Sequence, residues 1–95
     1  MHIISRKALR EFSERHPDSK SALDMWFHIL KTNRFESFNA LRSYFPSADK
    51  VGNRIVFNIG GNKYRLIASI HFNRQKVYVL HILTHDEYNR GTWKT

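Results

Sequence analysis

The sequence predicts an α+β fold in which an N-terminal strand and helices pack on one face of a small, largely antiparallel sheet. Apolar residues recur with the 3.6-residue helical period before Pro46 and alternate with polar residues after it. Two turn signals, Gly60-Gly61 and Asn73-Arg74, divide the second half into three strands. The length of 95 residues, of which 41% are hydrophobic, suits a single domain over residues 1–95 with one core.

In the first half, we expect a short strand at residues 2–5 and then three helices, the first over residues 6–15 and the third stopped by Pro46. Each helix follows a residue type that commonly caps helices, and the predicted caps are Ser5, Asp18 or Ser19, and Ser37. The residues expected to face the core are Ala8, Leu9 and Phe12, then Ala22, Met25, Trp26, Ile29 and Leu30, and finally Phe38, Leu41 and Phe45.

The second half predicts an antiparallel meander. Residues 53–59 form its first strand, with Ile55, Phe57 and Ile59 on one face. We expect Gly60-Gly61 to make a two-residue hairpin, because both turn positions then tolerate positive φ. The next strand covers residues 62–72. Residues 76–84 form the last strand, whose continuous apolar character predicts a strand that is central or covered on both faces, and a short helical turn follows it.

The strand at residues 62–72 has one apolar face and one cationic face. Its apolar parity consists of Tyr64, Leu66, Ala68, Ile70 and Phe72, and the other parity consists of Lys63, Arg65, Ile67, Ser69 and His71. The second set contains no carboxylate. We therefore expect the helices to cover the first face and the cations to point from an open second face.

The charge of the whole chain is also strongly positive, with a formal net charge of +8. No acidic residue occurs between Asp49 and Asp86, so the positive field lies on the C-terminal half. Its expected partner is a polyanion or an acidic protein surface. The candidate RNA-binding residues in this region are Arg54, His71, Arg74 and Lys76.

Several classes of protein are not expected from this sequence. It has no cysteine, which excludes disulfides and thiolate zinc sites, and His81 and His85 would lie about 13 Å apart along a strand. We expect no metal and no other cofactor. No apolar run approaches the roughly 20 residues that span a bilayer, so we expect a cytoplasmic protein without a membrane partner.

A cationic sheet face has the residue types needed to cleave RNA. The ribose 2′-hydroxyl is the nucleophile, so the protein has only to move protons and to stabilise the charge on phosphorus. Arg65 is the expected charge stabiliser, and His85 is the expected general acid or base. Tyr88 follows one helical turn later, and Lys63 supplies either charge or a base.

The stretches VFNIGGNKYRL, KVYV and LTHDEY, with the opening MHIISRKALREF and the segment FPSAD, resemble HigB-type toxins of the RelE superfamily over essentially the whole chain. The resemblance implies a ribosome-dependent mRNA endoribonuclease that inhibits translation. It also implies a helix-turn-helix, HigA-like antitoxin that neutralises the toxin. By position, Lys63 and Arg65 match the basic strand of the family pattern, and His85 and Tyr88 match its C-terminal His and Tyr.

The chain departs from that pattern at Leu80, where such proteins usually have an Arg. By strand parity, an Arg at position 80 would lie on the side of Tyr78 and Ile82 and would add a cation to the RNA-facing surface. We therefore expect Leu80→Arg to raise toxicity. Two alternatives remain open: a noncatalytic RNA-binding module, and an attenuated toxin whose basic face mainly binds an acidic segment of the antitoxin.

Overall fold

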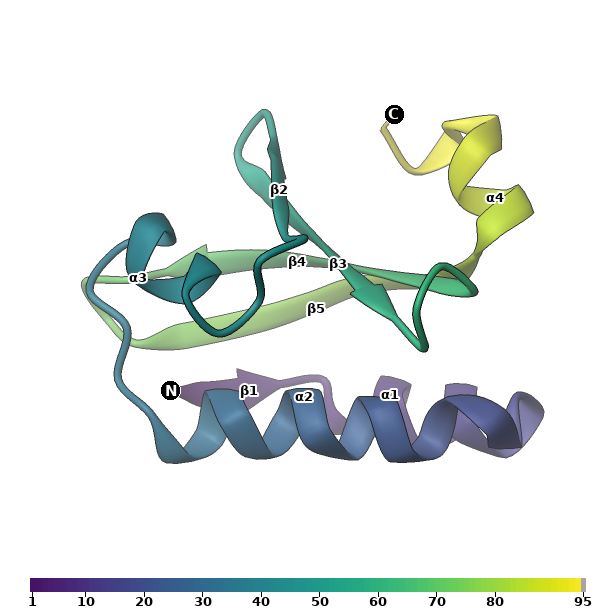
Figure 1. Cartoon of the computed structure of the whole chain (residues 1–95), viewed down its shortest axis with the longest axis horizontal. Helices are drawn as coiled ribbons and strands as arrows, with labels where there is room; N and C mark the ends of the chain where they lie inside the picture. The colour runs from purple at the N-terminus through teal and green to yellow at the C-terminus, as the bar shows by residue number, and fades with distance from the viewer. Residues whose placement is uncertain (95) are drawn as a thin grey trace.

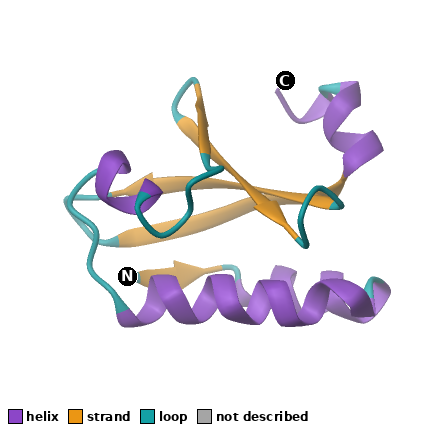
Figure 2. Cartoon of the chain, viewed as in Figure 1, coloured by secondary structure: helices purple, strands orange, loops and turns teal. Residues whose placement is uncertain are grey.

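A computed structural model describes residues 1–94 and places two helices beneath a five-stranded sheet (Figure 1). The helices α1 (Arg6–Arg15) and α2 (Lys20–Thr32) lie side by side, joined by the short 3-10 helix η1 (Pro17–Ser19). The strands are β1 (His2–Ile4), β2 (Asp49–Val51), β3 (Arg54–Ile59), β4 (Tyr64–His71) and β5 (Lys76–Thr84). Three short helices complete the chain: α3 (Phe38–Arg42), α4 (His85–Arg90) and the 3-10 helix η2 (Thr92–Lys94) (Figure 2).

The sheet has the strand order β1-β5-β4-β3-β2, and every neighbouring pair except one is antiparallel. The exception is β1, which lies parallel to the first part of β5. β5 therefore has a neighbour on each side, as its apolar composition predicted. The α+β class is confirmed, whereas β2 was not predicted because three residues are too few for an alternating pattern.

Helix boundaries follow the sequence more closely than the helix caps do. α1 has the predicted bounds, but Ser5 makes no capping bond because its own backbone is left-handed, with φ 80°. The hydroxyl of Ser19 donates to the carbonyl of His16 and does not cap α2. Ser37 does cap α3 by accepting from the amide of Ala40. α3 nevertheless ends at Arg42, before Pro46 is reached.

The hairpin between β3 and β4 is longer than predicted. β3 ends at Ile59 and β4 begins at Tyr64, so four residues, 60–63, connect them. Gly60 and Gly61 do have positive φ, 63° and 71°, which side chains rarely adopt. Lys63 lies in this loop, and the alternation of the strand therefore does not determine where its side chain points.

The main core lies between the helices and the sheet. Phe57 and Leu66 are buried in it, as predicted, while Ile70 is only partly buried. Met25 was expected in the core but is 64% exposed on the solvent side of α2. The other completely or nearly completely buried members include Phe12, Leu23, Trp26, Leu30, Phe35, Leu41 and Val77.

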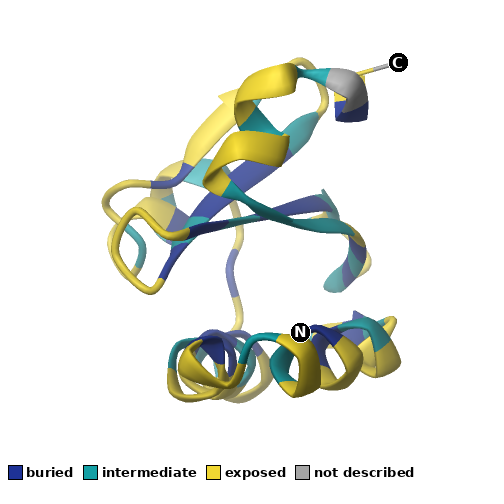
Figure 3. Cartoon of the chain, turned by 90° about the vertical axis from the view of Figure 1, so that its right-hand side faces the viewer, coloured by how far each residue is buried: buried dark blue, intermediate teal, exposed yellow. Residues whose placement is uncertain are grey.

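The opposite face of the sheet, here called the outer face, is not fully open. Trp93 of η2 packs on it against Val56 and Ile67, and all three are buried. We call these three residues the outer cluster. Figure 3 shows the C-terminal helix on the side of the sheet opposite α1 and α2. The expectation was that this face, or part of it, stays open; its middle is covered, because the chain turns back after β5, and the part beside the outer cluster stays open.

Candidate functional site

Arg65 lies on the outer face beside α4. It is opposite Asn58 of β3 and Leu83 of β5, near the end of the sheet where β5 passes into α4. Its guanidinium donates to the carbonyl of Tyr64 over 3.2 Å and approaches Nδ1 of His85 at 3.5 Å. The side chain is partly buried, so these contacts restrict its orientation and leave it accessible to a ligand.

His85 is held by its backbone while its ring stays exposed. Its N–H donates to the carbonyl of Lys63 over 3.1 Å, which ties the start of α4 to the loop before β4. An arginine can only donate hydrogen bonds, so a bond to Nδ1 of His85 requires a neutral ring with its proton on Nε2. The pair thus presents a fixed cation next to an imidazole that can exchange protons.

The start of α4 is fixed by a capping box. The hydroxyl of Thr84 accepts from the amide of Glu87, and the carboxylate of Glu87 accepts from the amide of Thr84 over 2.9 Å. The bond from the Thr84 amide is the largest cause that lowers the pKa of Glu87, and the Arg90 and His16 charges act in the same direction. The capping box thus fixes the point at which the chain passes from β5 into α4, which is His85.

Tyr88 links Arg65 to the outer cluster. The Arg65 guanidinium carbon lies 5.4 Å from the centre of the Tyr88 ring, within the range of a cation–π contact. The Tyr88 ring stacks on Trp93 with a centroid distance of 5.2 Å and an interplanar angle of 14°. Trp93 Nε1 donates to the Tyr88 carbonyl, and Arg54 donates to the Trp93 carbonyl over 2.8 Å. Trp93 was not predicted as part of the site, because its only signal in the sequence is one large aromatic residue near position 95.

Lys63 points away from Arg65. Its ammonium pairs with the carboxylate of Asp18 at 3.3 Å, and the hydroxyl of Tyr64 donates to the other Asp18 oxygen over 2.7 Å. The Tyr64 hydrogen bond is the main cause that lowers the pKa of Asp18, and it raises the pKa of Tyr64. The expectation that Lys63 points from the same face as Arg65, opposite the helices, is wrong, because Lys63 belongs to a loop and has a carboxylate partner in η1.

The parity argument for residue 80 is also wrong. Ile67 pairs with His81 and Ala68 pairs with Val79, which leaves Leu80 as the extra residue of a β-bulge. The bulge shifts the alternation, so Tyr78 belongs with the outer face while Ile82 packs against the main core. Leu80 is 40% exposed. It lines a shallow pocket with residues of α1, not with Arg65.

The four candidate RNA-binding residues do not form one group. Arg54 supports Trp93 and is partly buried. His71 and Lys76 lie opposite each other at the far end of the sheet, where the ring of His71 packs edge-on against Tyr78. Arg74 is exposed in the adjoining turn. The latter three therefore form a second basic area, separated from Arg65 by the outer cluster.

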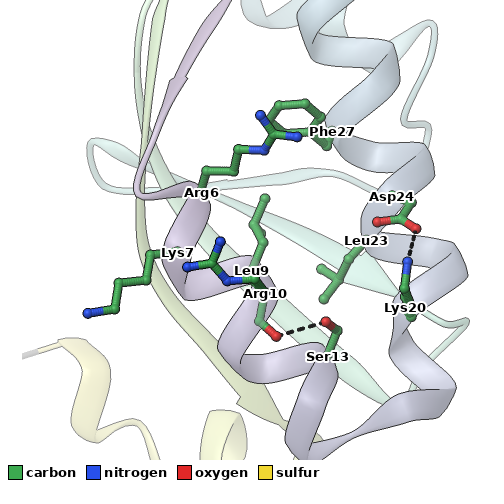
Figure 4. Close-up of a pocket in the computed structure, with 9 residues that line it drawn as sticks. All are labelled: Arg6, Lys7, Leu9, Arg10, Ser13, Lys20, Leu23, Asp24 and Phe27. Atoms are coloured by element: carbon green, nitrogen blue, oxygen red, sulfur yellow. Dashed lines mark hydrogen bonds and ion pairs between the residues drawn. The ribbon is translucent and has the colours of Figure 1, made fainter.

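A separate groove lies between α1 and α2 on the helical layer (Figure 4). It has a volume of about 590 Å³, and Arg6, Lys7 and Arg10 line it. Figure 4 also shows Lys20 paired with Asp24, at 2.8 Å. The residues that line the groove include no histidine, and their one carboxylate, Asp24, is paired with Lys20. We place the candidate site at Arg65 for that reason.

Two further properties concern the part of the chain that the structure describes. Residues 1–94 contain no group of three or more His, Cys, Asp or Glu arranged to hold a metal ion. Within the same residues, no helix is both long and apolar enough to cross a membrane.

Comparison with known proteins identifies similar chains. A family model described as HigB_toxin, RelE-like toxic component of a toxin-antitoxin system, matches residues 19–91. A protein of Escherichia coli K12 named mRNA interferase toxin HigB is 35% identical over 92 residues, which cover 94% of this chain and 88% of that protein. The mRNA interferase HigB of Escherichia coli O6:H1 is 34% identical over 95 residues, covering 97% of this chain and 92% of that protein.

Proposed function

The chain belongs to the HigB family of RelE-like toxic components of toxin–antitoxin systems, and on that premise we propose that it is an endoribonuclease that cleaves mRNA. The observation that carries the proposal is the approach of the Arg65 guanidinium to within 3.5 Å of the His85 imidazole. The pair lies where strands without any acidic residue, β3 to β5, meet α4. A phosphate therefore meets a cation and a proton-transfer group together.

The proposed reaction uses the ribose 2′-hydroxyl as nucleophile. A base removes its proton, the 2′-oxygen attacks phosphorus, and the bond from phosphorus to the 5′-oxygen breaks. The leaving 5′-oxygen takes a proton, so the products are a 2′,3′-cyclic phosphate and a 5′-hydroxyl. His85 exchanges these protons, and Arg65 stabilises the charge on the phosphorane. Tyr88 holds Arg65 through its ring and offers its hydroxyl to the RNA.

In this proposal the chemistry needs no metal, since the nucleophile is part of the substrate. Lys63 contributes through its carbonyl, which holds His85, while its ammonium remains with Asp18. His71, Arg74 and Lys76 bind the RNA backbone further along. The substrate is mRNA on the translating ribosome, which places the protein in the cytoplasm. Its partner is a helix-turn-helix, HigA-like antitoxin that neutralises it.

The decisive experiment compares mRNA from a translating extract after addition of the protein or of Arg65→Ala. Loss of one donor of this kind typically lowers the rate by about 10²–10³. Arg10→Ala is the matched control, because it removes an exposed arginine from α1 and should cleave normally. Cleaved ends should carry a 2′,3′-cyclic phosphate and a 5′-hydroxyl, the products of attack by the ribose 2′-hydroxyl.

Two results would contradict the proposal. Equal cleavage by Arg65→Ala and the wild type would remove Arg65 from the mechanism. RNA binding without any cleaved ends would instead support the noncatalytic RNA-binding module.

A further inference from the structure

One carboxylate on the helical side of the molecule contacts both residues that support the candidate site. Asp18 lies in η1, between α1 and α2. Its Oδ1 accepts from the Tyr64 hydroxyl over 2.7 Å, and its Oδ2 pairs with the Lys63 ammonium at 3.3 Å. Asp18 therefore binds the side chains of two consecutive residues, Lys63 at the end of the loop and Tyr64 at the start of β4.

The backbone of these same two residues holds the two groups assigned to the chemistry. The carbonyl of Lys63 accepts from the His85 N–H over 3.1 Å. The carbonyl of Tyr64 accepts from the Arg65 guanidinium over 3.2 Å. A shift of residues 63 and 64 would move both acceptors, and the Arg65–His85 separation would change with them.

The loop that carries Lys63 depends on such support. It includes two glycines with positive φ, and its internal bond from the Lys63 amide to the Gly60 carbonyl is long, at 3.4 Å. Tyr64 is better supported, since its ring is 8% exposed and packs against Phe12 at 5.2 Å and His16 at 5.3 Å. Asp18, which binds both side chains, thus connects Lys63 of the loop to Tyr64, which is packed in the core.

We propose that Asp18 is a positioning residue, which holds the Lys63 and Tyr64 carbonyls where they orient His85 and Arg65 for RNA cleavage. The effect on cleavage rests on the proposed function. The orientation of His85 and Arg65 by Asp18 is a property of the free protein. Asp18 contacts neither Arg65 nor His85 and acts only through the backbone of residues 63 and 64.

The test uses variants that separate charge from hydrogen bonding. Asp18→Ala and Asp18→Asn remove the same charge, but an asparagine oxygen can still accept from Tyr64. We expect Asp18→Ala to lower kcat at least tenfold while the KM for RNA changes less than twofold. Asp18→Asn should stay within threefold of the wild-type kcat. Asp24→Ala, which removes the exposed carboxylate paired with Lys20, should leave both constants unchanged.

A second readout needs no RNA. Amide hydrogen exchange at His85 reports the bond to the Lys63 carbonyl, and it should become at least tenfold faster in Asp18→Ala. Exchange at Leu66, in the main core, should not change. Tyr64→Phe removes the hydrogen bond to Asp18 by deleting the Tyr64 hydroxyl. This variant replaces Asp18→Ala in the experiment if Asp18→Ala does not fold. Its exchange at His85 should also rise at least tenfold.

The outcomes distinguish this inference from the proposed function. Normal kcat and normal His85 exchange in Asp18→Ala would overturn the positioning role while wild-type cleavage still stands. If the wild type cleaves no RNA, the proposed function fails, and the exchange rates alone decide whether Asp18 orders the His85 amide. A rise in KM with unchanged kcat would also overturn the inference, because positioning acts on the chemical step.

Discussion

The two sides of the sheet carry apolar clusters that differ in what they support. The main core joins the helices α1, α2 and α3 to four strands. The outer cluster consists of Val56, Ile67 and Trp93, with Tyr88 packed against it. The outer cluster supports the ring beneath Arg65, because Tyr88 stacks on Trp93, whereas the main core reaches Arg65 through the carbonyl of Tyr64. Most of the buried apolar residues thus lie on one face of the sheet, and the aromatic support of Arg65 lies on the other.

This difference has a physical basis in how the two clusters are connected. A residue of the main core is surrounded by several elements, so its packing contacts are lost only when the whole fold unfolds. The outer cluster has only three buried members and is closed by the three-residue helix η2, and segments with few buried apolar contacts open locally at lower free energy. Substitutions in the two clusters should therefore separate loss of folding from loss of cleavage.

The largest effect on stability is expected from Phe57→Ala. The Phe57 ring is 1% exposed and packs edge-on against Trp26 at 5.5 Å and Phe45 at 5.1 Å. Truncation leaves a cavity and should lower the free energy of unfolding by about 4 kcal/mol. For a chain of this size the melting temperature should fall by about 20 °C. A fall of only a few degrees would show that the main core closes around the gap.

A smaller loss of stability but a larger specific loss of cleavage is expected from Trp93→Ala. Trp93 is 4% exposed, and its removal should cost about 2 kcal/mol. The variant stays folded at 25 °C, yet Tyr88 loses its stacking partner and Arg65 its platform, so cleavage should fall at least tenfold. Thermal melts and the extract assay measure the two effects. Trp93→Phe is the control, since it keeps an aromatic ring there.

The third prediction concerns acid. Glu87 has a folded-state pKa below its ordinary value, so its contribution is present above the unfolded pKa, near 4.5, and disappears as pH falls through the folded pKa. Glu87→Gln keeps an oxygen that can accept from the Thr84 amide but removes the charge at the start of α4, and should cost roughly 0.5 kcal/mol at pH 7. The cost should shrink toward zero below pH 4. The magnitude is modest because the carboxylate is exposed.

Melting temperatures of wild type and Glu87→Gln, measured from pH 7 to pH 3, check the sign. Asp18→Asn provides a comparison with the other carboxylate whose pKa is lowered. A difference for Glu87→Gln that grows in acid would show that the capping box does not set the pKa of Glu87.

Local patterns predicted the elements, and long-range contacts decided the site. The bounds of α1 and β5 follow from periodicity, and Arg65 reaches the outer face as alternation requires. The predicted orientation of Lys63 was wrong because its partner, Asp18, is 45 residues away in the chain. The packing of Trp93 on the sheet was not predicted, because a single aromatic residue after the last strand forms no periodic pattern. Such contacts form only when distant segments meet, so no window of sequence contains them.

The smallest effect is expected from Leu80→Arg, the substitution that strand parity marked as important. A bulge residue that is 40% exposed can accept a longer polar side chain, so stability should change by no more than about 0.5 kcal/mol. Its neighbours in the shallow pocket include Glu11 of α1, whose carboxylate can pair with the new guanidinium, and Arg15, whose like charge opposes it.

Cleavage by Leu80→Arg should therefore stay within twofold of the wild type, and growth after induction should not change. The matched control is Leu80→Gln, which has a similar size without the charge. If only the arginine variant raises cleavage, the added cation reaches the RNA from the helical side of β5. The substrate would then contact both sides of the sheet, and the separation of a folding face from a functional face would no longer hold at the bulge.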